Sequence, residues 1–236
     1  MANTQKLLIT GVDTGVGKTF VAAGLTAALR EKGAFVGVYK PVQSGFFDND
    51  ARSDAAILAK AAGGAQSMRE VCPYRFHAPV APQLAAQMEN RRIDIGVIYD
   101  CFEELQKRFE LVVVEGAGGL LAPLGPDWTI LDMAARYKMP AIIVVANRLG
   151  CLNHALLTER ALRAEGISVL GFVLNNIGGG GDESVASNAQ MLSRLSGAPV
   201  WGPLNRCDAA RPEIDHAKKA VEKAVDLDFL MTALKG

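Results

Sequence analysis

Short apolar runs alternate with longer amphipathic stretches along the whole chain. Several of the apolar runs hold β-branched residues at consecutive positions, which is typical of strands covered by helices on both faces. This pattern predicts strands at residues 6–10, 35–39, 111–114, 141–146, 169–174 and 199–202. The stretches between them predict helices at residues 18–32, 53–63, 95–109, 129–137, 153–165, 182–196 and 214–234. Three glycines fall where such helices are expected to end: Gly33, Gly166 and Gly197.

The regular alternation of strand and helix predicts an α/β fold with a doubly wound, mostly parallel sheet flanked by helices on both faces. We expect a single domain over residues 1–236, because the alternation continues past the glycine-rich stretch at 175–184. In open parallel sheets, ligands bind beyond the carboxyl ends of the strands. The loops that follow the strands are therefore the candidates for chemistry.

Charge and cysteine content narrow the function classes. The 236 residues carry 25 Lys and Arg against 25 Asp and Glu. This balance argues against nucleic acid or an anionic membrane as a partner, since both attract an excess of cations. Cys72, Cys101, Cys151 and Cys207 are scattered, which favours free thiols in a reducing compartment. With no secretory pattern and no apolar run of bilayer length, we expect a cytoplasmic protein without a membrane segment.

The segment GVDTGVGKT at residues 11–19 lies between the first predicted strand and the first predicted helix. A glycine-rich turn at this point lets backbone N–H groups close around an anion, and the helix dipole points to the same place. Lys18 can reach the β- and γ-phosphates of a nucleotide, and the Thr19 hydroxyl can ligate Mg²⁺. Five residues separate Gly11 and Gly17, rather than the usual four. The alternative is a turn that needs glycine only for its shape, but the Gly-Lys-Thr sequence favours a domain of P-loop NTPase type.

Two acidic residues complete a possible magnesium site. Glu115 follows the buried run at 111–114 and precedes several glycines, and Asp54 stands beside Ser53 where a helix is expected to begin. Mg²⁺ prefers a few protein oxygens together with waters and phosphates, so Thr19, Asp54 and Glu115 would be a sufficient set. Each acid also has an ordinary structural explanation, Glu115 as a turn residue and Asp54 as part of a helix start.

Four segments occur in a characteristic order: GVDTGVGKT, YKPVQSG (39–45), VEGAGGLLAPL (114–124) and LGCLNHALLT (149–158). Together they closely resemble the dethiobiotin synthetase family, from residue 6 to about residue 204. In that family the phosphate loop is likewise one residue longer than usual. The resemblance implies a homodimer in biotin biosynthesis that uses ATP, Mg²⁺ and CO₂ or bicarbonate to close a cyclic urea on 7,8-diaminononanoate.

The resemblance also implies roles for individual residues. Lys18 and Lys40 would be catalytic, and Thr19, Asp54 and Glu115 would hold the metal. Substrate binding is implied for Thr14, Ser44, Gly118, Gly150, Cys151, Leu152 and Asn153. Nucleotide binding is implied for Thr14, Gly15, Val16, Gly17, Lys18, Thr19, Asp54, Glu115, Gly116, Ala117, Gly118, Asn175, Asn176, Leu204, Asn205 and Arg206.

Within these sets, Asn175 would recognise adenine, and residues 150–153 would come from the partner subunit and hold the substrate carboxylate. We expect Asn153 to cap that helix. Taken without the family, Lys40 is equally a surface lysine, Ser44 a loop serine and Asn175 a turn asparagine.

Five positions depart from the family pattern. Gly15 stands where glutamate is frequent, and Ala81 and Gln83 replace a serine and a histidine. Asn205 and Arg206 differ from the common end of the nucleotide loop. These departures leave the strictness for ATP open.

Two other functions compete. A ParA-like nucleotide switch would carry a second lysine early in the phosphate loop, where this chain has Asp13 or Thr14, and would need a cationic surface. A P-loop amidotransferase synthetase usually adds a glutaminase domain, for which 236 residues leave no room.

Overall fold

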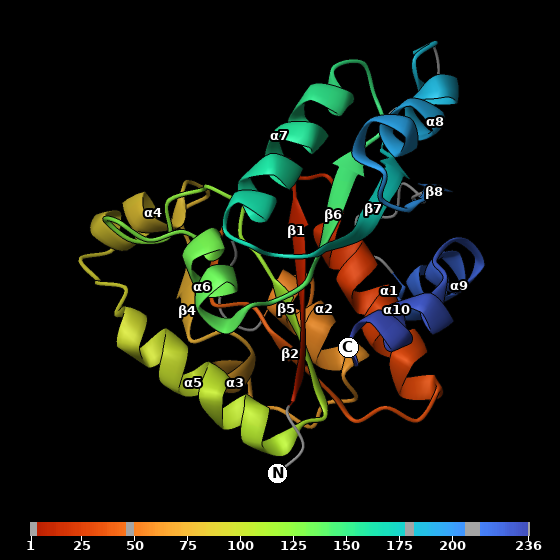
Figure 1. Cartoon of the computed structure of the whole chain (residues 1–236). Helices are drawn as coiled ribbons and strands as arrows, with labels where there is room; N and C mark the ends of the chain where they lie inside the picture. Colours follow the sequence, from red (N-terminus) through yellow and green to blue (C-terminus); the bar gives the residue numbers. More distant parts are fainter. Residues whose placement is uncertain (1–3, 46–49, 178–181, 206–212, 236) are drawn as a thin grey trace.

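A parallel β-sheet forms the centre of the molecule (Figure 1). The computed structural model describes residues 4–45, 50–177, 182–205 and 213–235. Within these residues the main sheet has six strands, and every neighbouring pair runs parallel. In sheet order they are β2 (Val36–Tyr39), β5 (Leu111–Glu115), β1 (Gln5–Gly11), β6 (Ala141–Ala146), β7 (Val169–Asn176) and β8 (Val200–Asn205).

Helices cover both faces of this sheet. Their bounds are α1 (Lys18–Glu31), α2 (Asp54–Ala61), α3 (Met68–Val71), α4 (Pro82–Met88), α5 (Ile95–Arg108), α6 (Ile130–Tyr137), α7 (Cys151–Ala164), α8 (Val185–Ser196), α9 (Ile214–Ala224) and α10 (Leu227–Ala233). Buried residues of α1, α2, α9 and α10 form one core cluster with the sheet, and those of α5, α6, α7 and α8 form a second. Both layers are visible in Figure 1. The predicted doubly wound α/β architecture is confirmed.

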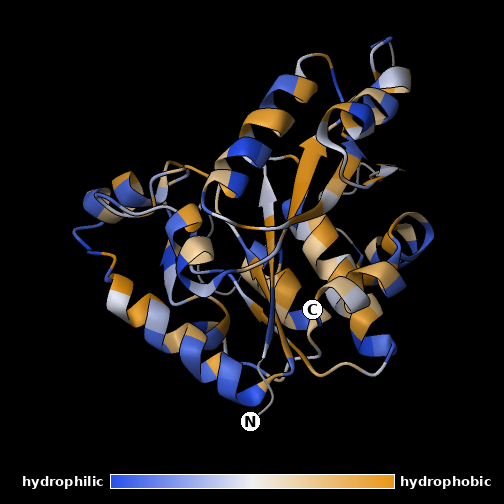
Figure 2. Ribbon diagram, in the orientation of Figure 1, coloured by the Kyte–Doolittle hydropathy of each residue, from blue (hydrophilic) through white to orange (hydrophobic). Residues whose placement is uncertain are grey.

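The strands form where both faces can be buried. Every residue of β5 and of β6 is buried, and β6 is coloured hydrophobic along its length in Figure 2. On β1, Leu7 and Ile9 pack into the cluster with α1, whereas Leu8 packs into the opposite cluster. This alternation follows from the pleat of a strand, which directs successive side chains to opposite faces. All six predicted strands are present in the main sheet.

Several elements were not predicted from the sequence. The strands β3 (Val42–Ser44) and β4 (Tyr74–Phe76) form a small parallel sheet of their own, and the short helices α3 and α4 flank β4 along the chain. The single helix predicted at 214–234 is wrong, because it is divided into α9 and α10. Asp226 begins the second of these helices by accepting a hydrogen bond from the Phe229 N–H at 2.9 Å.

Three helices end near the glycines that were predicted to end them, but one predicted helix start is wrong. α1, α7 and α8 end within two residues of Gly33, Gly166 and Gly197. The prediction that Asn153 caps α7 is wrong, because this helix begins at Cys151 with Gly150 as its N-cap. Gly150 has φ of 85°, a left-handed conformation that glycine adopts without a steric penalty. None of the helices in the described ranges combines the length and apolar character needed to cross a bilayer.

Candidate active site

The phosphate loop connects the carboxyl end of β1 to the start of α1. Gly17 is the N-cap of α1, with φ of 96°. A Cβ atom at Gly17 would lie 2.0 Å from Asn175 Nδ2, so only glycine fits here. The Lys18 side chain is 7% exposed, and its Nζ donates to the backbone oxygen of Asp13 at 2.8 Å. The loop therefore carries a largely buried cation at the amino end of a helix, where anions are favoured.

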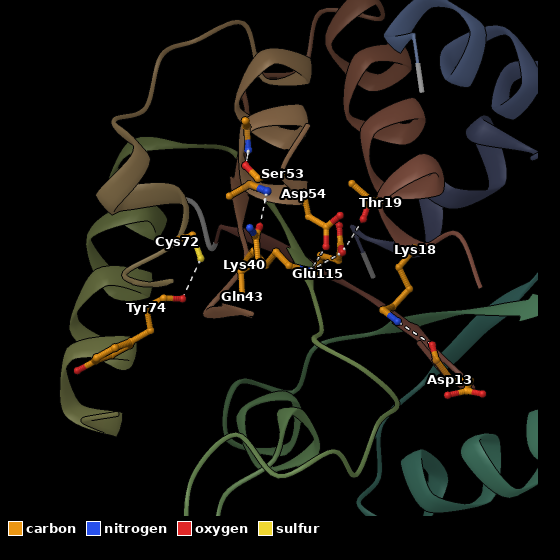
Figure 3. A network of polar contacts seen from close by, with 12 residues as sticks. Asp13, Lys18, Thr19, Lys40, Gln43, Ser53, Asp54, Cys72, Tyr74 and Glu115 are labelled. Atoms are coloured by element: carbon orange, nitrogen blue, oxygen red, sulfur yellow. Dashed lines mark hydrogen bonds and ion pairs between the residues drawn. The ribbon is translucent and has the colours of Figure 1, made fainter. Parts of the chain in front are cut away.

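A second buried lysine lies next to two carboxylates (Figure 3). Lys40 directly follows β2 and is 3% exposed. Its Nζ lies 2.6 Å from Glu115 Oε1 and 3.0 Å from Asp54 Oδ2. Glu115 ends β5 and Asp54 begins α2, so the arrangement joins three segments that are distant in the sequence. The carboxyl ends of the adjacent parallel strands β2 and β5 bring Lys40 and Glu115 together, and the start of α2 adds Asp54. This is the edge of an open parallel sheet at which ligands are expected to bind.

Burial and charge shift the pKa values of these groups. Burial, together with repulsion from Lys40, lowers the pKa of Lys18 to about 8. Burial alone would lower the pKa of Lys40, but the two carboxylates outweigh it and raise that pKa. Burial raises the pKa of Glu115, and the negative charge of Asp54 adds to the effect. At Asp54 the attraction of Lys40 and a hydrogen bond from Thr19 overcome burial and lower the pKa.

The proposed metal ligands lie together. Thr19 Oγ1 donates to Glu115 Oε1 at 2.9 Å, and Asp54 contacts the same lysine as Glu115. Glu115 Oε2 is buried and has no hydrogen-bond partner among the described residues. In that part of the chain there is no cluster of three or more His, Cys, Asp or Glu side chains able to hold a metal. Two carboxylates and a hydroxyl nevertheless fit Mg²⁺, which uses few protein oxygens and keeps several waters.

Buried polar contacts fix the start of α2 and hence Asp54. Ser53 is the N-cap, and its side chain accepts a hydrogen bond from the Ala56 N–H. Gln43 on β3 is 3% exposed, and its Oε1 accepts the Ala55 N–H at 2.8 Å. Gln43 was not among the predicted site residues. The available signal was a polar side chain directly after Val42, between the predicted site residues Lys40 and Ser44.

A cavity of about 1010 Å³ opens above these groups. The predicted site residues that line it are Thr14, Gly15, Gly17, Lys18, Thr19, Lys40, Ser44, Asp54, Glu115, Ala117 and Gly118. Its wall also includes residues that were not predicted, chiefly Gln43 and the turn at 79–82. Ser44 Oγ donates to the backbone oxygen of Val80 at 2.7 Å, which ties β3 to that turn. The cavity is large enough for a nucleotide and a small second substrate.

The remaining predicted nucleotide contacts are not among the residues that line this cavity. Val16 is buried, and Gly116 follows β5. Asn175 is fully buried, with its Nδ2 donating to the backbone oxygen of Val16 at 3.0 Å. Asn175 Oδ1 has no hydrogen-bond partner within the described ranges. The Asn175 amide thus lies against the phosphate loop.

Three further predicted nucleotide residues, Asn176, Leu204 and Asn205, lie at the carboxyl ends of β7 and β8. Asn176 Nδ2 donates to Asn205 Oδ1 at 3.1 Å, which joins the ends of β7 and β8. Leu204 is buried in β8. Arg206 lies outside the described residues, as does Cys207.

The predicted carboxylate-binding group at residues 150–153 forms the start of α7, separate from the cavity lining. Gly150 provides no side-chain cap, and the Cys151 N–H donates to the backbone oxygen of Arg148 at 3.1 Å. Asn153 is exposed and Leu152 is partly buried. Within one subunit, the structure therefore does not bring this group together with Lys18 and Lys40 in the same cavity.

Comparisons with known proteins agree with this geometry. A family model described as an AAA domain matches residues 5–213. The ATP-dependent dethiobiotin synthetase BioD of Bacillus licheniformis is 36% identical over 228 residues, which cover 96% of each chain. The protein of the same name from Anaeromyxobacter dehalogenans is 43% identical, over 80% of this chain and 85% of its own. The one from Akkermansia muciniphila is 38% identical, over 85% of this chain and 92% of its own.

Proposed function

The chain belongs to the ATP-dependent dethiobiotin synthetase family, and on this basis we propose that it converts 7,8-diaminononanoate, CO₂ and ATP to dethiobiotin, ADP and phosphate. The observation that carries the proposal is the pair of buried lysines at one cavity. Lys18 lies on the phosphate loop, and Lys40 lies beside two carboxylates at the ends of the neighbouring elements. Such a site can stabilise an anionic substrate that reacts with a nucleoside triphosphate.

Three steps account for the reaction. One amine of the substrate takes up CO₂ and loses a proton, giving a carbamate. A carbamate oxygen then attacks the γ-phosphorus of ATP, and the bond to the ADP oxygen breaks. The second amine attacks the carbamate carbon and loses a proton, the bond to the phosphate oxygen breaks, and the cyclic urea closes.

The two lysines have the charge that these steps need. Phosphoryl transfer depends mainly on positioning and on charge stabilisation, and a carbamate is already an anionic nucleophile. Lys18 would lie against the phosphates, where the start of α1 also favours negative charge. Lys40 would neutralise the carbamate and the γ-phosphate. The neutralisation of both anions would let them approach within bonding distance.

Thr19, Asp54 and Glu115 would hold Mg²⁺, since their oxygens lie together and Glu115 Oε2 is buried and unpaired among the described residues. Bound there, the metal would neutralise charge on the nucleotide phosphates. Gln43 and Ser53 keep Asp54 in place for this role by fixing the start of α2. Asn175 would recognise the adenine from the end of β7.

We further propose that two copies of the chain form a homodimer that completes the site. Leu149 and Leu157 lie in and beside the first turns of α7, and they are 80% and 56% exposed. Covering apolar side chains with this exposure by a second subunit is favourable, because it removes apolar surface from water. The backbone at residues 150–153 would then bind the substrate carboxylate from across the interface.

One incubation tests the reaction. Purified protein receives ATP, Mg²⁺, bicarbonate and 7,8-diaminononanoate, and ADP is followed together with the mass of the product. We expect equal amounts of ADP and dethiobiotin, and no ADP when the diamine is omitted. Lys18→Met should reduce the rate by on the order of 10²–10³. ADP release that ignores the diamine, without a cyclic urea, would instead favour the nucleotide-switch ATPase.

A further inference from the structure

A row of hydrogen-bonded asparagine side chains connects α8 to the loop that precedes α7. Asn188 on α8 is 3% exposed, and Asn147, directly after β6, is 6% exposed. Asn188 Nδ2 donates to Asn147 Oδ1 at 2.9 Å. Asn147 Nδ2 in turn donates to Asn176 Oδ1 at 3.0 Å and to the backbone oxygen of Val185 at 3.3 Å. Burying an amide without a hydrogen-bond partner costs free energy, so these side chains are held in the one arrangement that pairs them.

One end of this row of hydrogen-bonded asparagines holds the loop at residues 147–150. Asn188 Nδ2 also lies 3.4 Å from the backbone oxygen of Arg148. The next N–H group, that of Leu149, donates to Asp182 Oδ2 at 2.6 Å. Asp182 is itself fixed by hydrogen bonds from the Ser184 N–H and hydroxyl. Side chains from the region of α8 thus fix the backbone immediately before α7.

The other end reaches the phosphate loop. The Asn147 N–H donates to the backbone oxygen of Asn175 at 2.9 Å, and Asn175 Nδ2 donates to the backbone oxygen of Val16. Asn176 extends this row of hydrogen bonds to Asn205 at the end of β8. A contiguous hydrogen-bonded path therefore joins the phosphate loop to the start of α7, two places that the cavity itself does not connect.

We propose that Asn147 and Asn188 are positioning residues that couple nucleotide binding at the phosphate loop to the conformation of the loop at 147–150 and the start of α7. The consequence for the substrate carboxylate rests on the proposed function. Coupling of this kind is reciprocal: if the nucleotide raises the affinity for the diamine, the diamine raises the affinity for the nucleotide equally. Typical couplings change affinity by about 5- to 150-fold.

Hydrogen exchange of the backbone amides at 149–153 tests the coupling without the diamine. In the wild-type protein we expect a non-hydrolysable ATP analogue with Mg²⁺ to slow this exchange by about tenfold. In Asn188→Asp, the group that donates to Asn147 Oδ1 and Arg148 is replaced by an acceptor of the same shape. Exchange at 149–153 should become faster, and the analogue should no longer slow it.

Two further variants separate positioning from general stability. Asn147→Asp keeps the acceptor for Asn188 and the backbone N–H that donates to Asn175, but loses the side-chain donor that ties Asn147 to Asn176 beside it. Basal exchange at 149–153 should therefore stay near wild type, while the nucleotide effect should weaken because Asn147 is held less firmly against the end of β7. Gln66→Glu is the matched control, because Gln66 is also a buried amide, 7% exposed, and its Nε2 donates to the backbone oxygen of Val38. This control should keep the nucleotide effect whatever stability it loses.

The result that overturns the proposal is an unchanged nucleotide effect on residues 149–153 in both asparagine variants. The same holds if Gln66→Glu abolishes that effect as fully as they do, since the amides would then act only through stability. Titration of 7,8-diaminononanoate with and without the analogue adds the substrate readout. If the wild-type protein ignores the diamine while the exchange results hold, the proposed function fails and the positioning role stands.

Discussion

The Lys40 ammonium balances buried negative charge from two directions, Asp54 and Glu115. The Glu115 side chain is 1% exposed, so it has little access to water as an alternative partner. Breaking a buried ion pair by removing one member typically costs about 3–5 kcal/mol, because it leaves an uncompensated charge. We therefore expect Lys40→Met to lower the free energy of unfolding by about this amount in the presence of EDTA, measured by urea denaturation.

The double variant Lys40→Met with Glu115→Gln is the control for this prediction. The neutral amide leaves no unpaired charge at position 115, so the double variant should be more stable than Lys40→Met alone. If both variants lose the same stability, packing of the lysine stem accounts for the loss, and the charge balance does not.

Helices α1 and α9 cross closely at Gly24. A Cβ atom there would lie 2.5 Å from the backbone oxygen of Ala217 and 2.7 Å from Val221 Cγ2. Since helix backbones cannot yield as a side chain can, Gly24→Ala should force the two helices apart. We expect a loss of about 1–3 kcal/mol in the free energy of unfolding, as for other overpacked cores.

Ala27→Ser is a suitable comparison for Gly24→Ala, because Ala27 lies on the same helix and is only partly buried. It should change stability by about 0.5 kcal/mol or less, by the same denaturation measurement. A Gly24→Ala protein as stable as the comparison would show that the crossing of α1 and α9 adjusts without cost.

At the level of elements, what the sequence predicted depended on burial and length. The main-sheet strands were predictable because residues such as those of β6 are apolar at consecutive positions. β3 and β4 have three residues each, too few to show a period. The amphipathic pattern continues through Val225 and Asp226, so the break between α9 and α10 left little trace. Gly150 gives no clear signal for a helix start, because glycine more often ends helices than begins them.

For the candidate site, topology carried the prediction where strand ends converge. Lys18, Thr19 and Glu115 were expected near one another because parallel strands place their carboxyl ends at one edge. Asp54 was predicted at a helix start and Lys40 from the family resemblance, and all five residues line one cavity. Side-chain pairing between distant segments was not predictable in the same way. The hydrogen bond between Asn147 and Asn188 joins positions 41 residues apart, and a pattern of apolar periods contains no information about such amide pairs.

The subunit arrangement of the whole molecule is open to a direct test at Leu157, which lies on α7 and is 56% exposed. A glutamate at this position would have to be desolvated if a second copy covers α7. We expect Leu157→Glu to run as a monomer by light scattering, where the wild-type protein runs as a dimer. The Kd for the diamine should rise by about tenfold or more, and the Kd for the ATP analogue should stay within about threefold.

Phe229→Glu provides the matched surface change, because Phe229 is 41% exposed on α10, which packs against the opposite face of the sheet. It should leave both the mass and the diamine affinity unaltered. Equal loss of diamine and nucleotide binding in Leu157→Glu would remove the carboxylate site from the interface, and a dimer that persists would remove α7 from it. A selective loss of the diamine would instead mean that each phosphate-loop cavity depends on α7 of the other subunit for its second substrate.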